Sequence, residues 1–403
     1  METIERQFAQ VLSGEAGDLA SFYRRAREHG PFFSPDFNGW VVSSHADVSR
    51  VLTDETCFRP LGYGAGSSII HGRTILHMEG EEHRKKSALL ARHLRSPRLL
   101  DGVQRDFVVQ RANELIDSMP RTGSLDLKAG FTTPLPLDVT AWLMGIEEAP
   151  NFRETYDTIV AAGASNLRGD QDVQRRGEEA RAKLFAFLTP LIQQRRRDPA
   201  EDLLSVLCST EYEGTRLSDD EIRSFSSFLL AAGVETTDRA LSSLLSLLWQ
   251  RLDVWQELSS DREVLRAACA EGLRFSPPVH ALSRGVEADA EMSGTTIRAG
   301  DRIVALMAAA NRDPDVFDKP DEFVLRRFAQ QPDREFGAKA QILSFGYGTH
   351  LCTGSQLARL EMVEGLNVLL DRIATVHFTE GVPPESGYVL RSPEHLKVHV
   401  EFQ

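Results

Sequence analysis

Apolar residues recur at helical spacing along most of this chain. The longest such pattern covers residues 219–250, and similar spacing predicts helices at 80–94, 100–118, 149–165 and 173–197. A short helix is expected after Ser44, because Ser44 and Asp47 have the form of a capping box. The apolar positions of the longest pattern are Ile222, Phe225, Phe228, Leu229, Ala232, Leu241, Leu244, Leu245 and Leu248.

Strand signals are fewer and shorter than helix signals. An Asn38-Gly39 pair stands before an apolar run that starts at Trp40, which predicts a hairpin. Further short strands are expected within 294–306, at 375–378 and at 396–402. No Gly/Ser/Pro-rich linker, repeat or low-complexity tract divides the chain. The sequence therefore predicts a mainly α fold with small β-sheets, in one domain over residues 1–403.

The composition narrows the class of protein. The 403 residues are 41% hydrophobic and 26% charged, and 46 Lys and Arg stand against 59 Asp and Glu for a net charge of −13. This balance argues against a nucleic-acid binder. No signal peptide and no apolar run long enough for a bilayer is visible, so we expect no membrane partner and a cytoplasmic location. The four cysteines have neither disulfide nor metal spacing, which is typical of a reducing compartment.

One of these cysteines lies in an unusual setting. The stretch "LSFGYGTHLCTGSQLARLEM" places Cys352 between Gly346 and Gly348 on one side and a helical pattern on the other. A structural cysteine is a small buried hydrophobe and needs no such glycines. A thiolate ligand benefits from a helix N-terminus and from room for close approach of a large group. A zinc site is disfavoured, because His350 is the only other ligand nearby.

The long helix contains a second anomaly. Its middle reads "AAGVETTDRA", in which Gly233 costs about 1 kcal/mol relative to Ala. Thr236 and Thr237 are poor helix formers that can bond back to a carbonyl, and Glu235 is ionisable on an otherwise apolar helix. A weak solvent-facing turn would explain any one of these residues. Together they predict a helix opened to hold a polar group or small ligand in an apolar site.

These two stretches, in this order, resemble the cytochrome P-450 superfamily of haem-thiolate monooxygenases. "FGYGTHLCTG" matches the family's cysteine loop, F-x-x-G-x-H-x-C-x-G, and "AGVETT" matches its oxygen-activation motif. "EGLRFSPPVHALSRGV" contains the family's E-x-x-R pair, and "AAANRDPDVFDKPDEFVLRRF" matches the segment that completes it. The resemblance runs from about residue 20 to the C-terminus. It implies the cytochrome P-450 fold of the soluble bacterial type, with haem b between the long helix and the cysteine loop.

The resemblance also implies roles for individual residues. Cys352 would be the axial ligand of the haem iron, and Glu235 and Thr236 would be the catalytic pair that delivers protons during oxygen activation. Glu271, Arg274 and Arg327 would form a structural ion-pair set. The other expected haem contacts are His83, Arg284, Phe345, His350, Gly354 and Ala232.

The substrate is less readable. By resemblance, pocket walls should come from 60–76, 160–175, 279–283 and 386–391, and from one face of the long helix. The specific residues expected there are Phe228, Ala231, Ala232, Leu282 and, as a polar anchor, His280.

Two positions depart from the family's usual pattern. Ser87 stands where an arginine is common, with Lys85 and Lys86 as possible substitutes, and Thr353 follows the cysteine where an aliphatic residue or proline is usual.

The implied reaction is insertion of one oxygen atom from O2 into a small or medium organic molecule, such as a natural product of secondary metabolism. Electrons would come from NAD(P)H through a ferredoxin or flavodoxin-like donor and its reductase, to a monomeric enzyme. Alternatives that the sequence leaves open are nitration, carbon–carbon coupling or desaturation by the same haem chemistry, and a haem sensor or carrier without turnover. A basic patch for the acidic donor is expected on one helix, at Arg84, Lys85, Lys86, Arg92 and Arg95.

Overall fold

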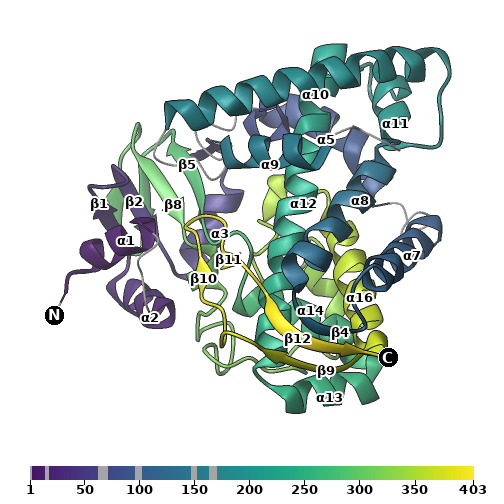
Figure 1. Ribbon diagram of the computed structural model, residues 1–403. Helices are drawn as coiled ribbons and strands as arrows, with labels where there is room; N and C mark the ends of the chain where they lie inside the picture. The colour runs from purple at the N-terminus through teal and green to yellow at the C-terminus, as the bar shows by residue number, and fades with distance from the viewer. Residues whose placement is uncertain (1, 14–17, 62–70, 96–101, 147–151, 163–169) are drawn as a thin grey trace. The chain divides into compact units, whose positions relative to one another are not determined.

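The computed structural model is mainly helical with small sheets (Figure 1). The chain divides into two compact units, each built from three separate segments. The expected single domain over 1–403 stays a prediction. Unit 1 comprises Met1–Leu61, Arg239–Cys352 and Gly381–Glu394; unit 2 comprises Gly62–Asp238, Thr353–Glu380 and His395–Gln403. The residues that the structure describes are 2–13, 18–61, 71–95, 102–146, 152–162 and 170–403.

Unit 1 contains a five-stranded sheet in the order β1-β2-β8-β5-β3. The β2–β8 pair is parallel and the other pairs are antiparallel. Two small two-stranded sheets, β6-β7 and β10-β11, accompany it. The strands of this unit are β1 (Phe32–Ser34), β2 (Gly39–Val42), β3 (Phe58–Pro60), β5 (Leu282–Val286), β6 (Ala290–Met292), β7 (Thr295–Ile297), β8 (Arg302–Ala305), β10 (Glu385–Ser386) and β11 (Ser392–Pro393).

The predicted hairpin is confirmed as β1–β2. Asn38 takes the left-handed conformation, with φ 52°, at the turn. Gly39 is required by close approach, because a Cβ there would lie 2.7 Å from the Arg302 carbonyl oxygen on β8. The turn therefore also sets how closely β2 can lie against its parallel neighbour.

The helices of unit 1 are short and enclose an aromatic core. Phe8, Phe22 and Phe32 are at most 3% exposed, and the Phe8 ring packs against the rings of both Phe22 and Phe32. Each such side chain contributes roughly 1.5–3 kcal/mol on burial. The helices are α1 (Ile4–Ser13), α2 (Leu19–His29), α3 (His45–Thr53), α13 (Leu252–Ser260), η3 (Arg262–Val264), α14 (Leu265–Phe275), α15 (Met307–Ala310), η4 (Pro332–Phe336) and η5 (Gly348–His350).

The expected helix after Ser44 is confirmed as α3. The Ser44 Oγ caps it by accepting from the Asp47 backbone N–H at 3.1 Å. The reciprocal half of the capping box differs from the prediction. The Asp47 carboxylate accepts from the Ser44 hydroxyl and from the Ser293 hydroxyl, at 2.9 and 2.6 Å.

Unit 2 is built around long helices and one three-stranded antiparallel sheet, β4-β12-β9. Figure 1 shows α9 beside α10, and β9 beside β12. The helices predicted at 80–94, 100–118, 149–165 and 173–197 are confirmed within the described residues, as α5, α7, α9 and α10. Residues 100–101, 149–151 and 163–165 of the predicted spans lie outside those residues. The elements of this unit are η1 (Ile75–His77), α5 (Gly80–Leu94), α7 (Val103–Asp117), β4 (Thr122–Asp126), η2 (Lys128–Thr132), α8 (Pro134–Leu143), α9 (Phe152–Ala162), α10 (Gln171–Arg197), α11 (Leu203–Ser209), α16 (Ser355–Arg372), β9 (Ile373–Phe378) and β12 (Lys397–Phe402).

The longest helix, α12 (Asp219–Trp249), matches the strongest sequence pattern and continues from unit 2 into unit 1. It is helical without interruption, so the expected opening around "AAGVETTDRA" is wrong at the level of the backbone. Gly233 has another reason to be glycine. A Cβ there would lie 3.0 Å from the Thr140 Oγ1, so the small residue lets α8 approach α12 closely.

Candidate functional site

The loop that carries Cys352 is a tight backbone structure. Gly346 and Gly348 have φ of 72° and 71°, the left-handed region that glycine enters without strain. The Cys352 N–H donates to the Phe345 carbonyl at 2.9 Å, which closes the loop on itself. A Cβ on Gly348 would lie 3.2 Å from the Leu52 carbonyl oxygen at the end of α3, so a larger residue there would push the loop away.

Cys352 differs from the buried cysteines in exposure. Its side chain is exposed, whereas Cys208 and Cys269 are buried. Burial raises the pKa of Cys208 to about 11 and that of Cys269 to about 12. Those two thiols are therefore protonated and inaccessible. An exposed thiol on a glycine-rich loop fits the soft thiolate ligand that haem iron accepts. The described residues hold no group of three or more His, Cys, Asp or Glu side chains that could bind a metal ion.

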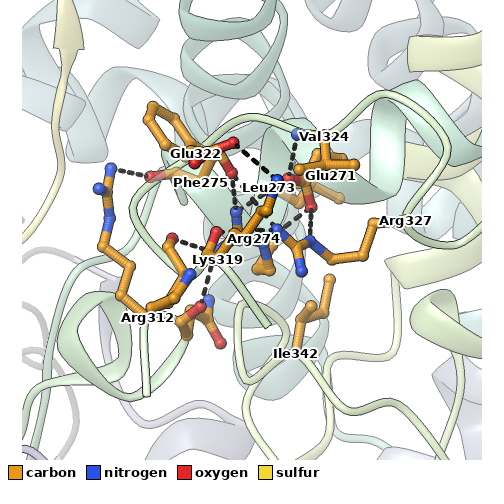
Figure 2. Close-up of polar contacts among 12 residues, drawn as sticks. Glu271, Leu273, Arg274, Phe275, Arg312, Lys319, Glu322, Val324, Arg327 and Ile342 are labelled. Atoms are coloured by element: carbon orange, nitrogen blue, oxygen red, sulfur yellow. Dashed lines mark hydrogen bonds and ion pairs between the residues drawn. The ribbon is translucent and has the colours of Figure 1, made fainter. Parts of the chain in front are cut away.

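A buried polar network holds the segment that leads into this loop, and Figure 2 shows its centre. Glu271 and Arg274 on α14 are fully buried and form a bidentate ion pair at 2.7 and 2.8 Å. The Arg327 Nε joins the same carboxylate at 3.0 Å, so the predicted set of three is confirmed. Arg274 also donates to the backbone carbonyls of Asn311, Pro320 and Glu322, at 3.0, 2.8 and 2.8 Å.

Asn311 extends this network to the cysteine loop, a role that no sequence pattern indicated. Its side-chain oxygen accepts from the Leu343 N–H at 2.7 Å, and its amide donates to the Ser344 Oγ at 2.9 Å. Ser344 in turn donates to the Leu273 carbonyl on α14 at 2.8 Å. Leu343 and Ser344 are the two residues directly before Phe345. The loop is therefore tied to α14 through a residue that the E-x-x-R pair itself positions.

The residues expected to bind haem carboxylates lie in both units. Arg284 on β5 is 6% exposed and His350 in η5 is half-buried; both belong to unit 1. His83 on α5 of unit 2 is 3% exposed. A buried guanidinium suits a buried carboxylate, because a buried charge needs compensation. Two of the expected nonpolar haem contacts are Phe345 and Gly354. Phe345 is half-buried, and its ring centroid lies 5.8 Å from that of Phe336. Gly354 is the N-cap residue of α16.

The acid–alcohol pair lies in unit 2, on α12. Glu235 is 8% exposed, and Thr236 is half-buried. The Thr236 hydroxyl donates to the Ala232 carbonyl at 2.7 Å, which is the back-bond that the sequence predicted. This bond leaves the hydroxyl oxygen available as an acceptor. Thr236 can therefore accept a hydrogen bond without breaking its bond to the helix.

A second acid near this pair was missed by sequence reasoning. Asp238 is 7% exposed and accepts from the Thr132 hydroxyl at 2.7 Å. Lys128 forms an ion pair with it at 3.1 Å. Both partners come from η2, a turn of π-helix, so the charge on α12 is compensated from a neighbouring element.

Of the expected pocket residues, Phe228, Ala231 and Ala232 lie at helical spacing on α12, and Leu282 is half-buried on β5. His280 does not have the setting expected of a polar anchor. Its Nδ1 is hydrogen-bonded to the Tyr23 hydroxyl at 2.6 Å, and its Nε2 is fully covered. The sequence could not indicate this, because the two residues are 257 positions apart. The expected wall residues 62–70 and 163–169 lie outside the described residues.

The basic residues of α5 also differ in setting from a free docking patch. Arg84 pairs with Glu213, Lys85 with Glu81, and Lys86 with both Glu82 and Glu221. Hydrogen bonds from Arg73 and Lys86 lower the pKa of Glu82 to about 2. Ser87 donates weakly to the Arg84 carbonyl at 3.4 Å. The described cations of this helix are thus largely neutralised, and the docking patch stays a prediction.

No helix in the described parts of the chain has the length and apolarity to cross a bilayer.

Comparison with known proteins gives a consistent picture. Residues 167–398 match the family model described as "Cytochrome P450". The chain is 32% identical to nocardicin C N-oxygenase of Nocardia uniformis, over 89% of each chain. It is 31% identical to a steroid C26-monooxygenase of Mycolicibacterium smegmatis, over 80% of this chain and 78% of that one. Among solved structures it resembles cytochrome P450 CYP109Q5 of Chondromyces apiculatus, with a TM-score of 0.84, 25% identity, and coverage of 98% of this chain and 97% of the other.

Proposed function

The chain belongs to the cytochrome P450 family of monooxygenases, which use haem and O2, and on that premise we propose a specific reaction and specific residue roles. The enzyme inserts one oxygen atom from O2 into a small or medium-sized, largely apolar organic molecule. Electrons reach it from NAD(P)H through a ferredoxin or flavodoxin-like protein and its reductase. The relatives named for N-oxygenation of nocardicin C and for oxidation of a steroid support a natural-product or steroid-like substrate.

The observation that carries this proposal is the Cys352 loop. It presents an exposed thiol on a backbone fixed by two left-handed glycines and by the Asn311–Ser344 hydrogen bonds. Haem b, when bound, supplies the iron at which O2 is reduced, with the Cys352 sulfur as its protein ligand. Arg284, His350 and His83 bind the haem carboxylates, while Phe345, Gly354 and Ala232 contact its nonpolar surface.

Glu235 and Thr236 move protons in this proposal. Glu235 relays protons from solvent, and the Thr236 Oγ1, whose own proton stays hydrogen-bonded to the Ala232 carbonyl, accepts a hydrogen bond that orients the proton at the reacting oxygen. The hydroxyl is held in one orientation by its bond to the Ala232 carbonyl. Such positioned proton transfer contributes about 10²–10⁴-fold in rate. The pair favours turnover over a haem sensor or carrier.

The experiment that tests this function is oxidation under isotopically heavy O2. The purified enzyme is reconstituted with surrogate ferredoxin and reductase, and a substrate is chosen from compounds that shift the Soret band. We expect one heavy oxygen atom per product molecule and no product with Cys352→Ala. Products without the heavy atom would instead support desaturation or coupling chemistry, and binding without any product would support a carrier.

A further inference from the structure

His71 is held against α12 by several contacts within unit 2. It is 6% exposed, and its Nδ1 is hydrogen-bonded to the Ser227 Oγ at 3.0 Å. Its ring meets that of Phe228 edge-on, with centroids 6.2 Å apart. The adjacent Gly72 has φ 78°, and a Cβ there would lie 2.6 Å from the Ser224 Oγ. Only glycine allows this segment to lie so close to the helix, so the imidazole has one defined position.

The His71 imidazole is neutral, and one of its two nitrogens makes no hydrogen bond to another described residue. Burial lowers the pKa of His71 to about 4, with smaller contributions from the charges of His77 and Arg181. Ser227 occupies the Nδ1, and no hydrogen bond joins the Nε2 to another residue in the described ranges. A neutral imidazole can donate or accept one hydrogen bond at that nitrogen, depending on the tautomer that Ser227 selects. It offers no charge to a carboxylate.

Because His71 contacts Phe228, its distance along α12 from Thr236 can be stated. Phe228 precedes Thr236 by eight residues, a rise of about 12 Å in an α-helix. Between them, the same side of the helix carries Ala231 and Ala232, which are half-buried and apolar. One end of this stretch therefore has a neutral hydrogen-bonding nitrogen, and the other has the proposed proton-delivery pair.

Resting on the function proposed above, we propose that His71 is a specificity-determining residue that hydrogen-bonds a neutral oxygen of the substrate, about 12 Å from the carbon that is oxidised. The substrate class is an elongated, largely apolar molecule with a hydroxyl or carbonyl group at its far end. The apolar surface between Phe228 and Thr236 contacts the body of the molecule. Ser227 is a positioning residue, because it acts on the substrate only through the imidazole.

The test is a binding comparison with dodecan-1-ol, dodecane and dodecanoate, read from the Soret shift of the holoenzyme. We expect the alcohol to bind about tenfold more tightly than the alkane, as one hydrogen bond would give, and dodecanoate to gain no more than the alcohol. His71→Phe should abolish the preference, while His71→Gln, which keeps a hydrogen-bonding group, should retain part of it. Ser227→Ala should reduce it without removing it. Equal binding of alcohol and alkane by the wild type, no binding of the three probes, or an unchanged preference in His71→Phe would overturn the proposal.

A chain-length series separates this inference from the proposed function. With alkanols from decanol to tetradecanol, the oxidised carbon should stay at a constant distance from the hydroxyl in the wild type. In His71→Phe the position should instead be set from the methyl end. Oxidation without any dependence on the hydroxyl would contradict the role of His71 and leave the monooxygenase function intact. Loss of the thiolate spectrum or of all oxidation would contradict the function itself.

Discussion

At the scale of single residues, the Thr236 hydroxyl has two roles. It bonds to its own helix, and we propose that it also directs a proton. Thr236→Ala removes both but leaves an α-helix that alanine favours. We therefore expect normal haem and substrate binding in this variant. Product formed per NADPH consumed should fall on the order of tenfold or more, with hydrogen peroxide rising in parallel.

The matched control for this prediction is Thr236→Ser, which keeps a hydroxyl at the same position. It should stay close to wild type in the ratio of product to NADPH. If Thr236→Ala remains as tightly coupled as the parent, the substrate or ordered water supplies the proton and the role given to Thr236 is wrong.

Glu235 should behave differently from Thr236 when it is changed. Glu235→Gln keeps the size of the buried side chain but cannot give up and regain a proton. Turnover should slow by roughly 10²-fold, while the ratio of product to NADPH changes little, because the alcohol remains. Steady-state kinetics with a peroxide assay measures both quantities. A fully active Glu235→Gln enzyme would show that protons enter by another route.

At the scale of elements, Asn311 connects the cysteine loop to α14. Asn311→Ala would leave the Leu343 N–H and the Ser344 hydroxyl without this partner in a buried site. We expect a loss of about 3 kcal/mol in the free energy of unfolding, since each unsatisfied buried group costs roughly 1–3 kcal/mol. Urea unfolding of the holoenzyme provides the measurement, with Gln331→Ala at an exposed amide as control. Equal stability of the two variants would mean that the loop is held by its glycines alone.

The helix α5 offers a second comparison between neighbouring residues. The Lys86 side chain is 13% exposed and pairs with two glutamates, whereas Lys85 pairs with Glu81, which is 72% exposed. Although burial alone would lower it, the bonds to Glu221 and Glu82 raise the pKa of Lys86. Lys86→Glu should therefore cost about 3 kcal/mol of stability, and Lys85→Glu less than about 1 kcal/mol. Similar losses in both variants would contradict this account of α5.

At the scale of the whole molecule, the sequence predicted what local patterns determine. The period of apolar residues located α12, and Asn38-Gly39 located the first hairpin. The resemblance to a known family supplied the E-x-x-R set, which is confirmed. The sequence could not predict contacts between distant segments. The Tyr23–His280 bond, the Asn311–Ser344 bond and the ion pairs of α5 depend on how elements pack, and no spacing rule encodes them.

Stability of the whole molecule should depend on the buried histidines. The pKa of His71 is lowered to about 4 in the folded state, against about 6.5 when unfolded. Between these values the unfolded chain binds a proton that the folded chain does not, so stability falls as the pH falls from about 6.5 to about 4. His71→Gln should remove up to about 3 kcal/mol of this loss. Unfolding in urea at several pH values measures it, and identical pH slopes for both proteins would contradict the lowered pKa.

The central claim is that Cys352 alone among the four cysteines is the haem ligand. The most direct measurement is the absorption spectrum of the reduced carbon-monoxide complex, in the wild type and in four single Cys→Ala variants. The account predicts the red-shifted Soret band of a thiolate-ligated haem in the wild type and after substitution of Cys57, Cys208 or Cys269. It predicts loss of that band only in Cys352→Ala. A thiolate spectrum that survives in Cys352→Ala would contradict the account.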